Sequence, residues 1–290
     1  MTDGVIVLSE QLSAGVQAEV QILDGFRTQQ QELLRAGSPE EYWQTGISQA
    51  PYQYAKVFES LPPGSKILDV GVGFGQSSVY LATRGHSVFA VEPSLSMCKL
   101  ICETARRFSL EITPVQGVGE NLSRVGITDF DAVVFNASLH HCDQPVAAIA
   151  EAFNCLKPGG QLVLVNENML KPWTSQKRFK RLLEIDPVGM GHYGGNEHAY
   201  HNQDYLRMIM TSFPSVELLI PRMDSALDEL EMLLARKFVD KTRIYGTNLS
   251  VLSRFFYYIL RQKVRAHPRI YRFLGRLSLL PVHFRAYKQV

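Results

Sequence analysis

The stretch Ile67-Leu-Asp-Val-Gly-Val-Gly-Phe-Gly75 decides the fold of this chain. It opens with the short apolar run of a buried β-strand, and residues without a Cβ follow at Gly71, Gly73 and Gly75. A helix pattern then begins near Gln76. In a strand, glycine turn and helix of this kind the backbone can approach a bound molecule closely, so the stretch predicts a cofactor site.

Short apolar runs alternate with helix-length segments on both sides of this turn. Such alternation is typical of repeated βαβ units and predicts an α/β fold with a parallel sheet. The expected strands are 66–70, 87–91, 111–116, 130–136 and 161–167, and the expected helices are 75–84, 94–107 and 144–156. Further on we expect a helix over 202–213 and strands over 215–220 and 281–287.

The chain of 290 residues is 46% hydrophobic, which fits one large α/β domain with additions. Residues 9–60 show the apolar spacing of amphipathic helices. We therefore expect a helical N-terminal cap over 1–60, a cofactor-binding core over 61–220, and a basic, aromatic helical insertion with the final strand over 221–290.

Charge is distributed unevenly along the chain. Residues 241–290 carry eleven Lys or Arg and no acid, so within a net charge of +2 the remainder carries −9. Nine aromatic residues interleave with the basic ones, which is the composition of an interfacial membrane helix and suggests that 241–280 contact an anionic membrane. The alternative is that these aromatics pack on the sheet or across a homodimer interface. We expect no nucleic acid partner, because no groove-reading motif accompanies the charge.

The cysteines and the apolar segments bear on location. Four cysteines lack both metal-ligand spacing and the density of a disulfide scaffold, and no stretch approaches a bilayer span or an export signal. We expect a cytoplasmic protein that can contact a membrane peripherally through the tail.

An acidic residue supports the prediction of a cofactor site and limits which cofactors fit it. Glu92 ends the second strand, where a carboxylate can accept hydrogen bonds from both ribose hydroxyls. A dinucleotide fingerprint would place glycine at position 76, where this chain has Gln76. Asp69 inside the turn suits a cofactor with a cationic amino acid end, so S-adenosylmethionine (SAM) is favoured over the NAD of an oxidoreductase.

The motifs together resemble those of class I SAM-dependent methyltransferases with a Rossmann-like fold, in the subgroup of ubiquinone, menaquinone and small-molecule O- and N-methyltransferases. The resemblance covers roughly residues 60–220. It rests on Ile67–Gly75, Val91-Glu-Pro-Ser94, Phe130-Asp-Ala-Val-Val-Phe-Asn136, Leu139-His-His141 and Leu156-Lys-Pro-Gly-Gly-Gln-Leu162.

The resemblance implies which residues hold each part of the cofactor. The turn would contact the methionine and ribose portions, and Glu92 the ribose diol. The loop near Glu120 would contact the adenine, and Asn136 the region of the sulfonium. The implied cofactor-binding residues are Asp69, Gly71, Gly73, Phe74, Gly75, Glu92, Pro93, Gly119, Glu120, Asn121 and Asn136. The chain departs from the family at Val118, where relatives often have an acid. Glu120 is equally compatible with a solvated loop acid.

Histidines are the candidates for catalysis. Methyl transfer from a sulfonium needs alignment and, for a hydroxyl acceptor, a base. The candidates are His140, His141, His198 and His201. The last two lie in 192–201, a polar segment that can cover a substrate or simply be a polar surface loop. We expect no metal there, because its histidine spacings match no recognised zinc or iron pattern.

These features predict SAM-dependent methyl transfer to a hydroxyl or amine of a small or lipid-linked molecule, with O-methylation favoured. The alternative from another class is a catalytically silent SAM-binding or membrane-surface adaptor.

Overall fold

The computed structural model describes residues 4–8, 12–45, 57–58, 61–185, 197–221, 259 and 263–289. These residues form an eight-stranded sheet in the order β1-β4-β3-β2-β5-β6-β8-β7. The strands are β1 (Ile6–Val7), β2 (Lys66–Val70), β3 (Ser87–Glu92), β4 (Ile112–Gln116), β5 (Phe130–Asn136), β6 (Leu156–Val165), β7 (Val216–Leu219) and β8 (His283–Tyr287). The first six strands in this order pair in parallel, whereas β8 is antiparallel to both β6 and β7. The predicted Rossmann-like α/β fold is confirmed.

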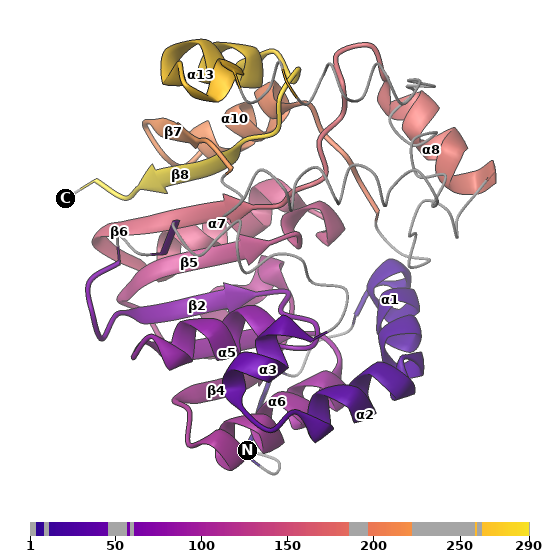
Figure 1. Cartoon of the computed structure of the whole chain (residues 1–290), viewed down its shortest axis with the longest axis vertical. Coiled ribbons are helices and arrows are strands. Elements are labelled where there is room, and N and C mark those ends of the chain that lie inside the picture. The colour runs from indigo at the N-terminus through magenta and orange to yellow at the C-terminus, as the bar shows by residue number, and fades with distance from the viewer. Residues whose placement is uncertain are drawn as a thin grey trace.

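Helices cover both faces of the sheet (Figure 1). The helices are α1 (Ala14–Gly25), α2 (Arg27–Arg35), α3 (Pro39–Gln44), α5 (Gln76–Thr83), α6 (Leu95–Phe108), α7 (Pro145–Cys155), α8 (Gln176–Ile185), α10 (Asn202–Met210) and α13 (Pro268–Arg276), with the 3-10 turns η1 (Gly119–Val125) and η2 (Leu139–His141). None of the helices in the described residues is long and apolar enough to cross a membrane.

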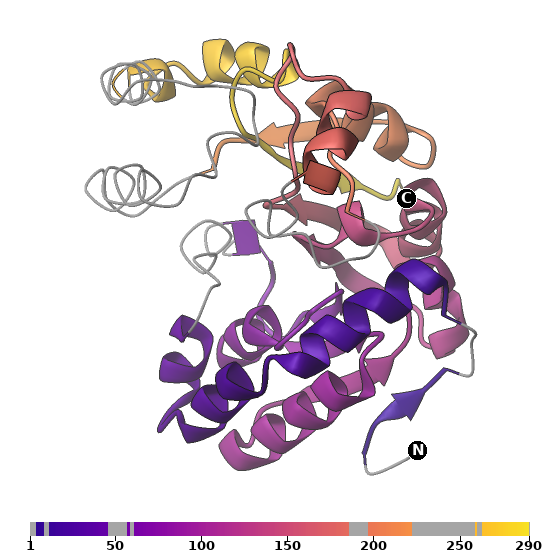
Figure 2. The ribbon, with the colours of Figure 1, turned by 90° about the vertical axis from the view of Figure 1, so that its right-hand side faces the viewer.

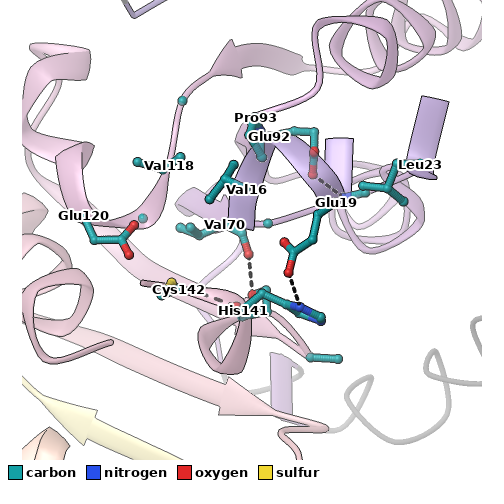
Figure 3. Close-up of a pocket in the computed structure, with 16 residues that line it drawn as sticks. Val16, Glu19, Leu23, Val70, Glu92, Pro93, Val118, Glu120, His141 and Cys142 are labelled. Carbon is teal, nitrogen blue, oxygen red and sulfur yellow. Dashed lines mark hydrogen bonds and ion pairs between the residues drawn. The ribbon is translucent and has the colours of Figure 1, made fainter. Parts of the chain in front are cut away.

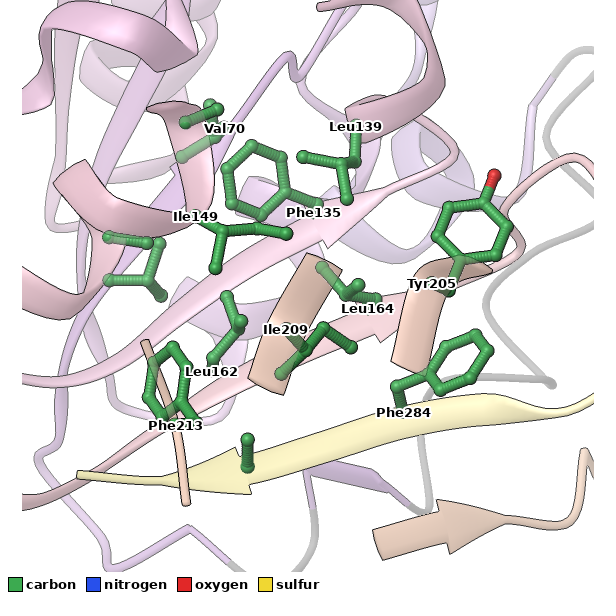
Figure 4. Close-up of a cluster of buried hydrophobic side chains, with 14 of the residues drawn as sticks. Val70, Phe135, Leu139, Ile149, Leu162, Leu164, Tyr205, Ile209, Phe213 and Phe284 are labelled. Atoms are coloured by element: carbon green, nitrogen blue, oxygen red, sulfur yellow. The ribbon is translucent and has the colours of Figure 1, made fainter. Parts of the chain in front are cut away.

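Strand β2 is buried on both faces, as an apolar run in a parallel sheet should be. Ile67 packs into the cluster beneath α3, α5 and α6, whereas Leu68 and Val70 join the opposite cluster. That second cluster includes Ile149 of α7 and Tyr205 of α10, and Figure 4 shows their side chains converging on β5 and β6. Two apolar layers therefore hold the sheet rigid beneath its carboxyl edge.

The N-terminal segment departs from a purely helical cap. Residues Ile6–Val7 pair with Val115 and Gln116 and extend the sheet at its β4 edge. After this strand, α1 begins at an N-cap made by Ser13, whose hydroxyl accepts from the amide of Val16 at 3.2 Å. Helices α1 and α2 then run beside α6 (Figure 2). The division into 1–60, 61–220 and 221–290 stays a prediction.

Strand β6 begins at Leu156, five residues earlier than the sequence indicated. The register shifts between Phe130, opposite Leu156, and Ala132, opposite Gln161. The intervening Pro-Gly-Gly turn is thus a bulge within the strand pair, which apolar patterning does not reveal.

Candidate functional site

The glycine turn follows β2, and its three glycines have different surroundings. All have positive φ, at +70° for Gly71, +53° for Gly73 and +76° for Gly75. A Cβ on Gly71 would lie 2.5 Å from Ser138 Cβ, and one on Gly75 would lie 2.6 Å from Ile101 Cγ1. A Cβ on Gly73 would meet nothing within 4 Å. Two glycines therefore permit close packing, and Gly73 faces open space.

Glu92 joins the end of β3 to this turn. Its Oε2 accepts a hydrogen bond from the amide of Gly73 at 2.8 Å, and its Oε1 accepts one from Ser94 at 3.0 Å. Complete burial raises the pKa of Glu92 to about 7, although both hydrogen bonds lower it. The carboxylate is therefore fixed in direction and close to its titration point at neutral pH.

A cavity opens between the turn, Glu92 and the ends of β4 and β5 (Figure 3). Helix α1 covers it from the N-terminal segment. The lining residues are Val16, Glu19, Leu23, Val70, Gly71, Gly73, Glu92, Pro93, Gly117, Val118, Gly119, Glu120, Ala137, Ser138, His141 and Cys142. This is the carboxyl edge of a parallel sheet, where Rossmann-like folds bind their ligands.

Six of the predicted cofactor-binding residues line this cavity: Gly71, Gly73, Glu92, Pro93, Gly119 and Glu120. Glu120 is anchored there, because its Oε1 accepts from the amide of Gln144 at 3.0 Å. Val118 also lines the cavity, at the position where the chain departs from the family pattern. Their contacts with a cofactor stay predictions.

The other five, Asp69, Phe74, Gly75, Asn121 and Asn136, are not part of the lining. Asp69 is fully buried, and its Oδ2 accepts from the hydroxyls of Ser77 and Ser78 at 2.7 Å each. Asn136 Oδ1 accepts from Asn166 at 2.8 Å. The structure thus gives Asp69 and Asn136 positions behind the cavity wall, where they support the turn and the strand ends.

Sequence reasoning missed the contribution of α1. Val16, Glu19 and Leu23 are spaced by three and four residues, so they lie on one side of the helix, the side that faces the cavity. The apolar spacing of this segment predicted a helix. It did not indicate which part of the core that helix would cover.

His140 and His141 lie together on η2, with ring centroids 4.3 Å apart. His140 Nδ1 lies 2.7 Å from Oε2 of Glu167, a carboxylate that also accepts from the amides of Ser138, Leu139 and His140. Glu167 therefore fixes both the turn and the imidazole. It lies at the end of a predicted strand, but no local pattern linked it to His140, 27 residues away.

His141 is the one predicted catalytic histidine that lines the cavity. Its Nδ1 lies 3.0 Å from Glu19 Oε1 and 3.7 Å from Glu197 Oε2. Burial lowers the pKa of His141, but the hydrogen bond and charge of Glu19, with the other carboxylates, outweigh burial and raise it. A proton therefore has a well-stabilised place at the cavity wall.

The remaining two candidates have different surroundings. The amide of His198 donates to the carbonyl of His140 at 3.1 Å, and burial lowers the pKa of its ring. His201 precedes α10, and its amide and Nδ1 lie 3.2 and 3.3 Å from Asp204 Oδ2. His201 thus completes a helix N-terminus. Residues 192–196 of the predicted substrate loop lie outside the described residues.

A glycine turn, a carboxylate on the next strand and a roofed cavity between them are the features expected of an adenosine-type cofactor site on a Rossmann-like sheet. Residues 68–164 match the family model of a methyltransferase domain. The demethylmenaquinone methyltransferase of Renibacterium salmoninarum is 35% identical over 102 residues, 35% of this chain and 41% of that protein. A ubiquinone biosynthesis O-methyltransferase of Xanthomonas campestris pv. campestris is 37% identical over 111 residues, 37% of this chain and 44% of that protein. The chain spans less than half the length of these two relatives.

Solved structures share the fold across more of the chain. Phosphoethanolamine N-methyltransferase 2 of Haemonchus contortus matches 94% of this chain and 60% of its own, with a TM-score of 0.55 and 14% identity. Geranyl diphosphate C-methyltransferase of Streptomyces coelicolor A3(2) matches 81% of this chain and 75% of its own, with a TM-score of 0.52 and 16% identity. Residues 68–164 are thus a methyltransferase domain of the class I SAM-dependent type, and the cofactor predicted from the glycine turn, SAM, is confirmed.

Proposed function

We propose that the whole protein is an active methyltransferase that transfers the methyl group of SAM to a hydroxyl of a small or lipid-linked molecule. The observation that carries this proposal is the position of the His141–Glu19 pair in the wall of the cavity that also contains Gly73 and Glu92. An amine acceptor can need only alignment, whereas a hydroxyl needs to lose a proton. A polarised imidazole at the cavity wall therefore favours a hydroxyl oxygen over an amine nitrogen as the methyl acceptor.

The reaction is a displacement at the methyl carbon. The acceptor oxygen forms the new C–O bond while the C–S bond breaks, and the sulfur keeps the electron pair as S-adenosylhomocysteine. The hydroxyl proton passes to the His141–Glu19 pair, whose nearest atoms lie 3.0 Å apart. The name of the O-methyltransferase relatives from Xanthomonas supports the same choice of acceptor atom.

We also propose that the tail contacts an anionic membrane. Of residues 241–280, the structure describes 259 and 263–280. On α13 and just after it, Ile270, Phe273 and Leu277 are exposed by 50, 61 and 38%, and their spacing places them on one side of the helix. Arg269 and Arg276 flank this apolar stripe, an arrangement that suits the boundary between lipid headgroups and acyl chains. A protein bound to a membrane in this way would meet a lipid-linked acceptor there.

Turnover distinguishes an enzyme from a silent SAM-binding adaptor. The purified protein is incubated with radiolabelled SAM and fractions of cell extract, and the labelled product is identified by mass spectrometry. We expect S-adenosylhomocysteine and an ether-linked methyl group. SAM binding without label transfer to any fraction would favour the adaptor, and a label on nitrogen would overturn the hydroxyl acceptor.

A further inference from the structure

The two imidazoles beside the cavity are surrounded by carboxylates. His140 Nε2 lies 3.9 Å from Glu197 Oε1, and His141 Nδ1 lies 3.7 Å from Glu197 Oε2. One ligand atom from each of these three residues lies within 4.8 Å of the other two. The side chains of His140 and Glu197 are only 4 and 8% exposed, whereas that of His141 is 24% exposed and opens the group to the cavity.

The hydrogen bond to Glu167 sets the direction in which His140 can bind. Glu167 accepts hydrogen bonds from three backbone N–H groups, and its Oε2 lies 2.7 Å from His140 Nδ1. The ring proton of neutral His140 therefore lies on Nδ1, and the lone pair of Nε2 faces Glu197. A carboxylate behind a histidine is the arrangement that orients metal-ligating imidazoles.

The carboxylates around the two histidines also favour a bound cation. Glu19, Glu167 and Glu197 all form ion-pair contacts with this histidine pair, and their side chains are 13, 2 and 8% exposed. Three carboxylates therefore surround two imidazoles. Partly buried negative charge of this kind is stabilised by a bound cation.

We propose that His140, His141 and Glu197 bind one divalent transition-metal ion at the wall of the SAM cavity. Two imidazoles and one carboxylate suit Zn²⁺, Mn²⁺, Fe²⁺ or Co²⁺ better than Mg²⁺ or Ca²⁺, which prefer oxygen ligands. The ligand atoms need to move together by roughly 1 Å to reach typical metal–ligand distances of about 2.0–2.2 Å. Glu19 then exchanges its contact with His141 for the metal ion or the acceptor proton.

The consequence for the reaction rests on the proposed function. A metal ion here would bind the acceptor oxygen and lower the pKa of its hydroxyl, so that Glu19 can accept the proton. The ion would thereby activate a hydroxyl and would offer an amine acceptor no comparable advantage.

Metal binding can be measured without SAM or acceptor, which separates this inference from the proposed function. The full chain is stripped with a chelator, dialysed and titrated with Co²⁺ while its visible absorption is followed. We expect bands of low-coordinate Co²⁺ that saturate at one ion per chain and disappear when Zn²⁺ is added. No such spectrum in the wild-type protein would overturn the proposal.

Variants locate the site. Glu197→Gln and His140→Asn should weaken Co²⁺ binding by at least ~10-fold, and Glu167→Gln, which removes the orienting carboxylate, by ~10–100-fold. His201→Asn is the matched control, since His201 lies at the start of α10 and should leave binding unchanged. Circular dichroism of each variant checks its folding. Unchanged Co²⁺ binding in folded Glu197→Gln and His140→Asn would place the ion elsewhere and overturn the proposal.

Discussion

The amide of Gly73 donates a hydrogen bond of 2.8 Å to the Glu92 carboxylate. The glycine turn after β2 and the acid that ends β3 are therefore one unit, although 19 residues separate them. The parallel register between β2 and β3, with Val70 opposite Val91, brings the two together. One side of this unit faces the cavity, so a change at either residue should affect the same ligand.

Gly73→Ala should weaken SAM binding at least tenfold, because the added methyl group enters the cavity. Gly85→Ala is a matched control, since Gly85 also has positive φ, at +82°, with nothing within 4 Å of an added Cβ, and it does not line the cavity. Both variants should lose a similar ~1–2 kcal/mol of stability through backbone strain. Calorimetric titration with SAM measures the difference, and equal affinities for the two variants would contradict the prediction.

Glu92 should make SAM binding depend on pH. Burial raises the pKa of its carboxyl to about 7, and ribose hydroxyls donate to the ionised form. Affinity should therefore rise between roughly pH 6 and pH 8 and then level off. Glu92→Gln should bind SAM more weakly by roughly 1.5–3 kcal/mol and lose this pH dependence. A wild-type affinity that is flat over this range would show that Glu92 does not hold the ribose in its ionised form.

The elements that define the cofactor site were predictable because their signals are local. β5 was predicted at its observed bounds, Phe130–Asn136, from one apolar run, and the glycine turn follows from three residues close in sequence. Covering and supporting contacts were not predictable. Glu19 meets His141 from 122 residues away. No periodicity or motif spacing specifies such a contact, because packing of α1 against the finished core creates it.

Asp69 illustrates a second limit of sequence reasoning. Its position in the motif implied a cofactor contact, but the direction of its side chain depends on Ser77 and Ser78, because its carboxylate accepts hydrogen bonds from their hydroxyls. These serines belong to the first turn of α5. An acid beside a glycine turn can face either the ligand or the following helix, and only the packed structure distinguishes the two.

Asp69→Asn should change how stability depends on pH. Burial raises the pKa of Asp69 to about 6, although the two serine hydroxyls lower it. A raised folded-state pKa means that the folded protein binds the proton more tightly, so this group's contribution to stability is lost as pH rises from about 4 to 6. The uncharged variant should avoid that loss and gain roughly 3 kcal/mol relative to wild type over this range.

Urea titrations at several pH values measure the free energy of unfolding of both proteins. Asp131→Asn is a control of opposite sign, because the contacts of Asp131 with Lys157 and the amide of Lys66 outweigh burial and lower its pKa. That variant should lose stability relative to wild type as pH rises. If the free energy of unfolding changes with pH in the same way for wild type and Asp69→Asn, ionisation of Asp69 does not destabilise the folded protein.

His141→Ala should lower turnover by ~10² or more with SAM affinity nearly unchanged, since it removes the group that activates the acceptor. His201→Ala, outside the cavity lining, is the control and should keep near-normal turnover. Single-turnover rates and SAM titrations separate the two effects. If the His140, His141 and His198 variants also turn over normally, catalysis is alignment alone and an amine becomes the better acceptor.

The exposed face of α13 predicts salt-sensitive membrane binding. Each basic residue near an anionic leaflet contributes roughly 1 kcal/mol, an attraction screened within about 10 Å at 0.1 M salt, whereas inserted apolar side chains resist salt. The protein should co-sediment with phosphatidylserine vesicles at low salt, less at high salt, and little with neutral vesicles. Phe273→Ser should weaken this binding, while Trp173→Ser, which removes a side chain that is 53% exposed before α8, should not. Equal loss in both variants would mean that general surface hydrophobicity drives binding. Absence of binding at low salt would assign the aromatic residues to packing or a dimer interface, and a small soluble acceptor would then fit the cavity better than a lipid-linked one.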